Sequence, residues 1–107
     1  MEINGQLEIG YQDDQGCFHK TFTMRLATLE DIEKAIEAAG IGASTARIRR
    51  YEWARTLTQL GSFKDEAITP EMLATLASTE FGVLEAAQET LRGKLKAVSN
   101  ASKNIEP

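Results

Sequence analysis

The sequence predicts an α+β fold in which an N-terminal antiparallel β-hairpin packs against a bundle of about four helices. Apolar residues alternate in the first quarter of the chain, and helical periodicities with capping residues fill the rest. The length of 107 residues suits one hydrophobic core. We therefore expect a single α+β domain over residues 1–98. Residues 99–107, rich in Ser, Asn and Lys, are expected to form a disordered tail.

The predicted hairpin has one apolar face with a period of two. Its apolar positions are Leu7, Ile9, Tyr11, Phe18, Phe22, Met24 and Leu26. Residues 13–16 lie between the two strands and supply the turn chemistry. A two-stranded ribbon alone is marginally stable in water, so helices must cover this face or partner strands must extend it. The open edges of the hairpin are candidate pairing sites.

Two helices are expected in the middle of the chain. The first begins at Thr28, which can form a capping box with Asp31, and ends at Gly40. The second is expected to run from about Ser44 or Thr45 to Leu60 and to stop at Gly61. Its apolar residues lie on more than one face, which suggests that the helix is contacted on two sides.

Two further helices are expected after a loop over residues 61–68. Thr69 followed by Pro70 is a strong helix start, since Thr caps the helix and Pro is favoured at the first helical position. Residues 78–80 then open a long final helix with near-heptad apolar spacing. Taking the periodic face of each element together, we predict these core residues: Leu26, Ile32, Ile36, Leu57, Leu73, Leu84 and Leu91.

Composition narrows the class of protein. Cys17 is the only cysteine, so no intrachain disulfide can form, which favours a reducing cytoplasm. The sequence has no leader pattern and no apolar run of the ~20 residues that span a bilayer. We expect a soluble, cytoplasmic protein with no membrane association. The formal net charge of -4 argues against a general nucleic-acid binder.

Residues that could perform catalysis or bind a metal are few. Cys17 and His19 share a strand face, but zinc needs three or four ligands and the chain has no second Cys or His. The carboxylates of residues 30–37 are expected to cap the first helix and to form a solvated face. The glycines around residue 41 lack the lysine of a phosphate-binding loop. We expect no catalytic, cofactor-binding or metal-binding residues and therefore a non-enzymatic protein.

The second helix carries the main concentration of basic and aromatic residues. Its arginines are Arg47, Arg49, Arg50 and Arg55, and Tyr51 and Trp53 lie among them. One alternative is a small DNA-binding regulator that uses the Arg47 to Arg55 helix. However, the four arginines spread around the helix axis, and Glu52 is spaced to pair with Arg49 and Arg55. A protein-binding surface is therefore favoured over nucleic acid. Its predicted residues are Arg50, Tyr51, Trp53, Phe63 and Phe81.

The order of the elements resembles the small tail assembly chaperones of tailed bacteriophages, especially Mu-like and related contractile-tailed phages. The resemblance covers most of residues 17–95. It lies in three segments: Phe22-Thr23-Met24-Arg25-Leu26 at the end of the hairpin, the Thr28-Leu29-Glu30-Asp31-Ile32 helix start, and the Thr69-Pro70-Glu71-Met72-Leu73 helix start. The chain departs from the family in its basic Arg47 to Arg55 cluster and in its short extension after Leu95.

The resemblance implies a non-enzymatic protein of a phage or prophage that acts in virion assembly. Its partner would be the tape measure protein or another phage tail protein, which it would keep competent for tail assembly in the bacterial host cytoplasm. The family supplies no catalytic residues to carry over. Homo-oligomer formation stays open, since chaperones of this kind often act as multimers on a client.

Overall fold

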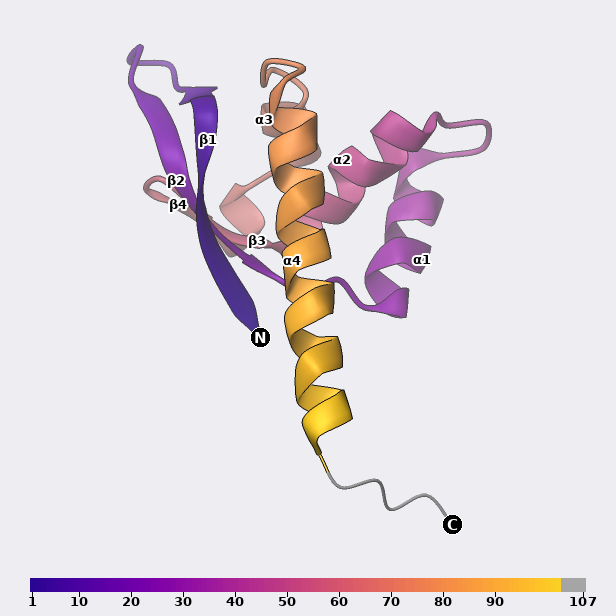
Figure 1. The fold of residues 1–107 in the computed structure, drawn as a ribbon. Coiled ribbons are helices and arrows are strands. Elements are labelled where there is room, and N and C mark those ends of the chain that lie inside the picture. Colours follow the sequence, from indigo (N-terminus) through magenta and orange to yellow (C-terminus); the bar gives the residue numbers. More distant parts are fainter. Residues whose placement is uncertain (103–107) are drawn as a thin grey trace.

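A computed structural model describes residues 1–102 and confirms the α+β class (Figure 1). The sheet contains β1 (Glu2–Gln12), β2 (Phe18–Arg25), β3 (Leu57–Leu60) and β4 (Phe63–Lys64), all antiparallel, in the order β1-β2-β3-β4. The helices are α1 (Leu29–Ala39), α2 (Thr45–Thr56), the short α3 (Pro70–Leu73) and α4 (Glu80–Ala101), with a 3-10 turn, η1, at Asp65–Ala67. Helix α4 packs on β1 and β2, while α1 packs against α2.

The hairpin forms as predicted, but its buried apolar face contains fewer residues than the sequence predicts. Strands β1 and β2 are paired from Glu2 to Gln6, and pairing resumes at Tyr11 after an irregularity. Gly10 has a φ of 103° within this bulge, a conformation that glycine adopts without strain. The bulge interrupts the period of two, so Ile9 is exposed although it was predicted on the apolar face. Phe18, at the start of β2, is exposed as well.

The predicted end of the second helix is wrong. Helix α2 ends at Thr56, and residues 57–60 form strand β3, which pairs with β2 and places Leu60 opposite Phe22. The β2 edge of the hairpin is therefore paired within the same chain, while β1 forms one edge of the described sheet. Gly61, with a φ of 58°, turns β3 into β4, and the ring of His19 lies so close that a Cβ would meet its Nδ1 at 2.1 Å. The predicted loop over residues 61–68 thus contains a strand and η1.

Most of the predicted core is confirmed. Leu57, Leu73, Leu84 and Leu91 are buried in one cluster together with Phe22, Met24 and Trp53. Leu26 packs against this cluster while partly exposed, and Ile32 is partly buried. Ile36 is 49% exposed, so its assignment to the core is wrong. Helix α1 turns Asp31, Ala35 and Ala39 inward instead, because a nearby pair of arginines offers partners for the carboxylate.

Asp31 joins three elements through its carboxylate. The capping box with Thr28 is present as predicted, but Asp31 is 2% exposed, so its expected place on a solvated face is wrong. Two nitrogens of Arg25 on β2 donate to the carboxylate at 2.6 and 2.8 Å, and Nε of Arg55 at the end of α2 donates at 3.1 Å. The hydrogen bonds from Arg25, supported by those from Thr28 and Arg55, hold the pKa of Asp31 well below its usual range.

Asp31→Ala is expected to lower the free energy of unfolding at pH 7 by about 2 to 4 kcal/mol, since it removes one half of the capping box and leaves two arginines without their carboxylate. A depressed folded-state pKa stabilises the fold above the unfolded pKa of about 4, and this contribution is lost as the pH falls through the folded pKa. The difference from wild type should therefore shrink on acidification. Urea unfolding at pH 7 and at low pH measures it, with Glu33→Ala on the exposed side of α1 as the control. Equal midpoints at pH 7 would contradict the assigned role.

The first part of helix α4 packs against the other elements, and its C-terminal part extends beyond them. The buried amide of Gln88 accepts from the backbone N of Ala27 at 3.0 Å and donates to the carbonyl of Arg25 at 2.9 Å, which fastens the β2–α1 connection. After Leu91 each residue through 102 is exposed, and the helix projects beyond the body (Figure 1). The helix continues to Ala101, three residues past the predicted domain end at 98. The remainder of the predicted tail, residues 103–107, lies outside the described residues.

Candidate functional site

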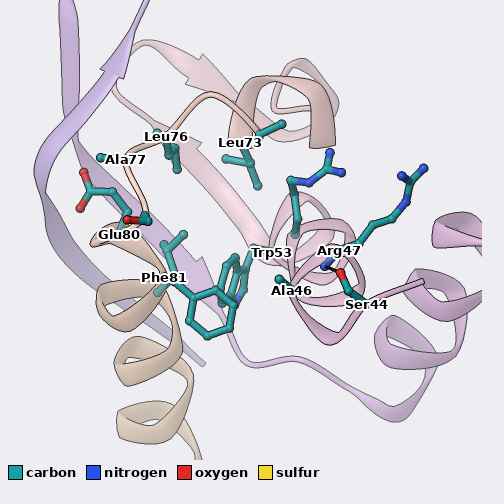
Figure 2. Close-up of a pocket in the computed structure, with 13 residues that line it drawn as sticks. Ser44, Ala46, Arg47, Trp53, Leu73, Leu76, Ala77, Glu80 and Phe81 are labelled. Carbon is teal, nitrogen blue, oxygen red and sulfur yellow. Dashed lines mark hydrogen bonds between the residues drawn. The ribbon is translucent and has the colours of Figure 1, made fainter. Parts of the chain in front are cut away.

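An open groove of about 480 Å³ lies between α2 and the segment that leads from α3 into the first turn of α4. Trp53 and Phe81 meet within it, while Glu80 and Arg47 lie on opposite sides (Figure 2). Apolar residues prevail in the lining. The residues concerned are Ser44, Ala46, Arg47, Arg50, Trp53, Leu73, Ala74, Leu76, Ala77, Ser78, Glu80, Phe81 and Leu84.

The apolar part of the groove is continuous with the core. Trp53 is 4% exposed, and Leu73 and Leu84 are buried beside it in the same core cluster. Phe81 is 37% exposed and meets the indole edge to face, with the ring centroids 5.0 Å apart. The indole Nε1 of Trp53 is buried and donates to no acceptor among residues 1–102. An unpaired buried donor costs about 1 to 3 kcal/mol and is rare in folded chains.

The basic part of the groove consists of Arg47 and Arg50 on α2. Arg50 Nη1 donates to the carbonyl of Pro70 at 2.9 Å, which holds this side chain against the start of α3. Both guanidinium groups lie over the ring of Tyr51, at 5.8 and 5.4 Å from its centroid. Within residues 1–102 no carboxylate forms an ion pair with either arginine. Two positive charges are therefore available beside an apolar surface.

The other two arginines of α2 form ion pairs. Arg49 pairs with Glu52 and with Glu85 on α4, each at 3.2 Å, and Arg55 pairs with Asp31. The predicted surface lattice is thus only partly correct, since Glu52 is buried and pairs with Arg49 but not with Arg55. Burial raises the pKa of Glu52 although Arg49 acts in the opposite direction. These contacts fasten α2 to its neighbours and hold both guanidinium groups against carboxylates.

Glu80 lines the groove, and its carboxylate forms hydrogen bonds with β1. The two oxygens accept from the backbone N atoms of Glu8, Ile9 and Gly10 at 2.8, 3.0 and 2.9 Å. Burial raises the pKa of Glu80, but these three hydrogen bonds outweigh it and hold the pKa below its ordinary value. One carboxylate thereby satisfies the three N–H groups that the bulge of β1 leaves out of the sheet.

The five predicted partner-binding residues do not share one face. Arg50, Trp53 and Phe81 line the groove, but Trp53 is 4% exposed and so offers a partner almost no surface. Tyr51 borders a second hollow of about 310 Å³ between α1 and α2, because residues two apart on a helix point in roughly opposite directions. Phe63 packs elsewhere, with its ring 5.6 and 5.1 Å from those of Tyr11 and His19.

Several residues of the groove have only a weak signal in the sequence. Arg47 is one of four arginines on the same helix, and only contacts within residues 1–102 show that it and Arg50 have no carboxylate partner there while Arg49 and Arg55 do. Leu76 and Ala77 lie in the turn before α4. Two apolar residues in a turn are a signal for a contact with the rest of the fold, and this signal could have pointed to the groove. Glu80 was taken only as part of the helix start, and its contacts with β1 join residues about seventy positions apart.

His19 and Cys17 have separate environments. His19 Nε2 is 2.7 Å from a carboxylate oxygen of Asp13, and its Nδ1 accepts from the backbone N of Ser62 at 3.4 Å. The hydrogen bond between His19 and the carboxylate lowers the pKa of Asp13. Cys17 is exposed in the turn between β1 and β2. Within the described range, no three His, Cys, Asp or Glu residues are grouped to hold a metal ion.

Comparisons of the chain with protein-family models, curated proteins and solved structures found no match. Over residues 1–102, no helix combines the length and the apolar character needed to cross a membrane.

Proposed function

We propose that this protein is a non-enzymatic tail assembly chaperone of a phage or prophage, which binds a helical segment of the tape measure protein or of another phage tail protein. The family resemblance supports the class of client. The groove between α2 and α4 supports the mode of binding. Its action would take place in the cytoplasm of the bacterial host, where the tail assembles.

The observation that carries the proposal is the combination of an apolar groove with two unpaired arginines. An amphipathic helix binds such a groove through apolar side chains spaced at helical intervals. Arg47 and Arg50 would select a segment with Asp or Glu next to those apolar side chains. The exposed part of Phe81 offers an aromatic contact, and such contacts often dominate interface energies.

The DNA-binding alternative has less support. Phosphate contacts require several free cations on one surface, whereas Arg49 and Arg55 are held by carboxylates. Arg47 and Arg50 are the two arginines of this helix that no carboxylate of residues 1–102 binds, and two cations are few for a phosphate-binding surface.

The test is binding of overlapping tape measure fragments from the same phage genome, followed by calorimetry on the best fragment. Phe81→Ala combined with Arg47→Ala and Arg50→Ala should weaken binding about thirtyfold or more, since aromatic and arginine contacts carry much of such energies. Trp53 is not substituted because its loss would damage the core. Lys64→Ala with Lys96→Ala is the matched control, because it removes two exposed positive charges that lie outside the groove.

Wild type should also keep the co-expressed fragment in solution, and the groove variant should fail while folded. Undiminished binding by the folded groove variant would exclude the groove as the client site. Salt-dependent retention of wild type on DNA that is lost in the same variant would favour the regulator instead.

A further inference from the structure

The projecting end of α4 carries an exposed apolar stripe bordered by positive charges. Leu95 and Val98 are 44% and 54% exposed, and with Leu91 they are spaced on one side of the helix. Arg92, which pairs with Glu89 on the same helix, lies one turn before Leu95. Lys94, which forms no ion pair within residues 1–102, lies one turn before Val98. We call these four exposed residues, Arg92, Lys94, Leu95 and Val98, the α4 tip. The buried seam of the core thus continues onto a surface that no other described element covers.

Helix α1 carries a second exposed apolar stripe, with the opposite charge. Leu29 and Ile36 are 86% and 49% exposed and lie two helical turns apart. Glu33 lies between them along the same side. Glu37, which is 3.9 Å from Lys34 in an ion pair on the same helix, lies one turn beyond Glu33. We call these four residues, Leu29, Glu33, Ile36 and Glu37, the α1 outer face. Its isoleucine and leucine are exposed because Ala35, Ala39 and Asp31 face the interior.

We propose that the α4 tip of one copy docks on the α1 outer face of a second copy. Each surface is a short helical stripe with two apolar side chains, so the two can pack side by side as a pair of helices. Lys94 would then approach Glu33, which gives complementary charge at the border of the apolar contact. Arg92 and Glu37 would add to this only by exchanging their own partners, Glu89 and Lys34.

The charges determine the kind of assembly. Two α4 tips would bring the Lys94 of each copy together, and two α1 outer faces would bring the Glu33 of each copy together, so a symmetric dimer is disfavoured. A contact between different surfaces is heterologous, and it leaves one α4 tip and one α1 outer face free after each addition. The chain therefore forms rings or linear arrays. Because the contact involves short helical segments, we expect it to be weak and dependent on concentration. It does not depend on the client-binding groove, which lies on other residues.

The first experiment is sedimentation velocity of the whole chain from about 10 to about 500 µM, a range chosen for a small interface. Wild type should increase in mean mass with concentration. Leu95→Ser with Val98→Ser, and separately Leu29→Ser with Ile36→Ser, should stay monomeric over this range. An equimolar mixture of the two variants should form a dimer with one copy of each, since one intact contact is restored and growth then stops. Ile9→Ser with Phe18→Ser is the matched control, because it removes two exposed apolar side chains from the hairpin.

A charge exchange tests the same contact without removing its apolar residues. Glu33→Lys alone and Lys94→Glu alone should each weaken self-association about tenfold, and the two changes in one chain should restore it. Circular dichroism checks that each variant is folded. If a serine variant fails to fold, the charge variants still test the contact. A wild type that is monomeric throughout, a mixture without dimer, or a charge exchange that restores nothing would overturn the proposal.

Discussion

Leu91→Ala and Leu57→Ala are each expected to lower the free energy of unfolding by about 2 to 5 kcal/mol. Leu91 is fully buried and Leu57 nearly so, and both belong to the cluster in which α4, β3 and the hairpin meet. Truncation removes favourable burial and leaves a cavity that a close-packed core refills only in part. Equilibrium unfolding in urea measures the change for each variant.

Leu95→Ala is the control for Leu91→Ala, because it lies one turn further along the same side of α4 and is partly exposed. Its effect should be within about 0.5 kcal/mol at concentrations where the protein is monomeric. If Leu91→Ala unfolded at the wild-type midpoint, the packing of α4 on the sheet would be wrong.

Glu80→Ala is expected to cost about 3 kcal/mol, since three backbone N–H groups of β1 lose a charged acceptor. Of the three, the N–H of Gly10 is the most buried, whereas Glu8 and Ile9 can recover hydrogen bonds from water. Glu80→Gln should cost less, because one amide oxygen can still accept. The folded-state pKa of Glu80 is depressed, so its contribution is complete above the unfolded pKa of about 4.3 and is lost as the pH falls through the folded value.

Urea midpoints measured at pH 7 and at successively lower pH test this expectation. The gap between wild type and Glu80→Ala should narrow on acidification. Glu89→Ala is the control on the same helix, because Glu89 is exposed and pairs only with Arg92 one turn away. A Glu80→Ala variant as stable as this control would show that the bulge of β1 does not need the carboxylate.

The sequence by itself determined the elements whose signals are local. Thr28 and Thr69 cap their helices as predicted, because a cap depends on residues within one turn. The hairpin followed from the period of two and from the turn at residues 13–16. Four of the seven predicted core residues are buried for the same reason, since each lies on the main apolar side of its element.

Only the tertiary structure decided the features that depend on contacts between distant segments. Residues 57–60 could continue a helix, but the unpaired edge of β2 provides backbone partners that make them a strand. The apolar residues of α2 spread around its axis, so no periodicity could decide that Trp53 faces the core while Tyr51 faces another hollow. Likewise, Asp31, Glu52 and Glu80 are buried because their partners lie on other elements, and hydrogen bonds and ion pairs offset the loss of water that burial requires. The groove forms where α2, α3 and α4 meet, so the sequence of any one of these helices could not predict which residues line it.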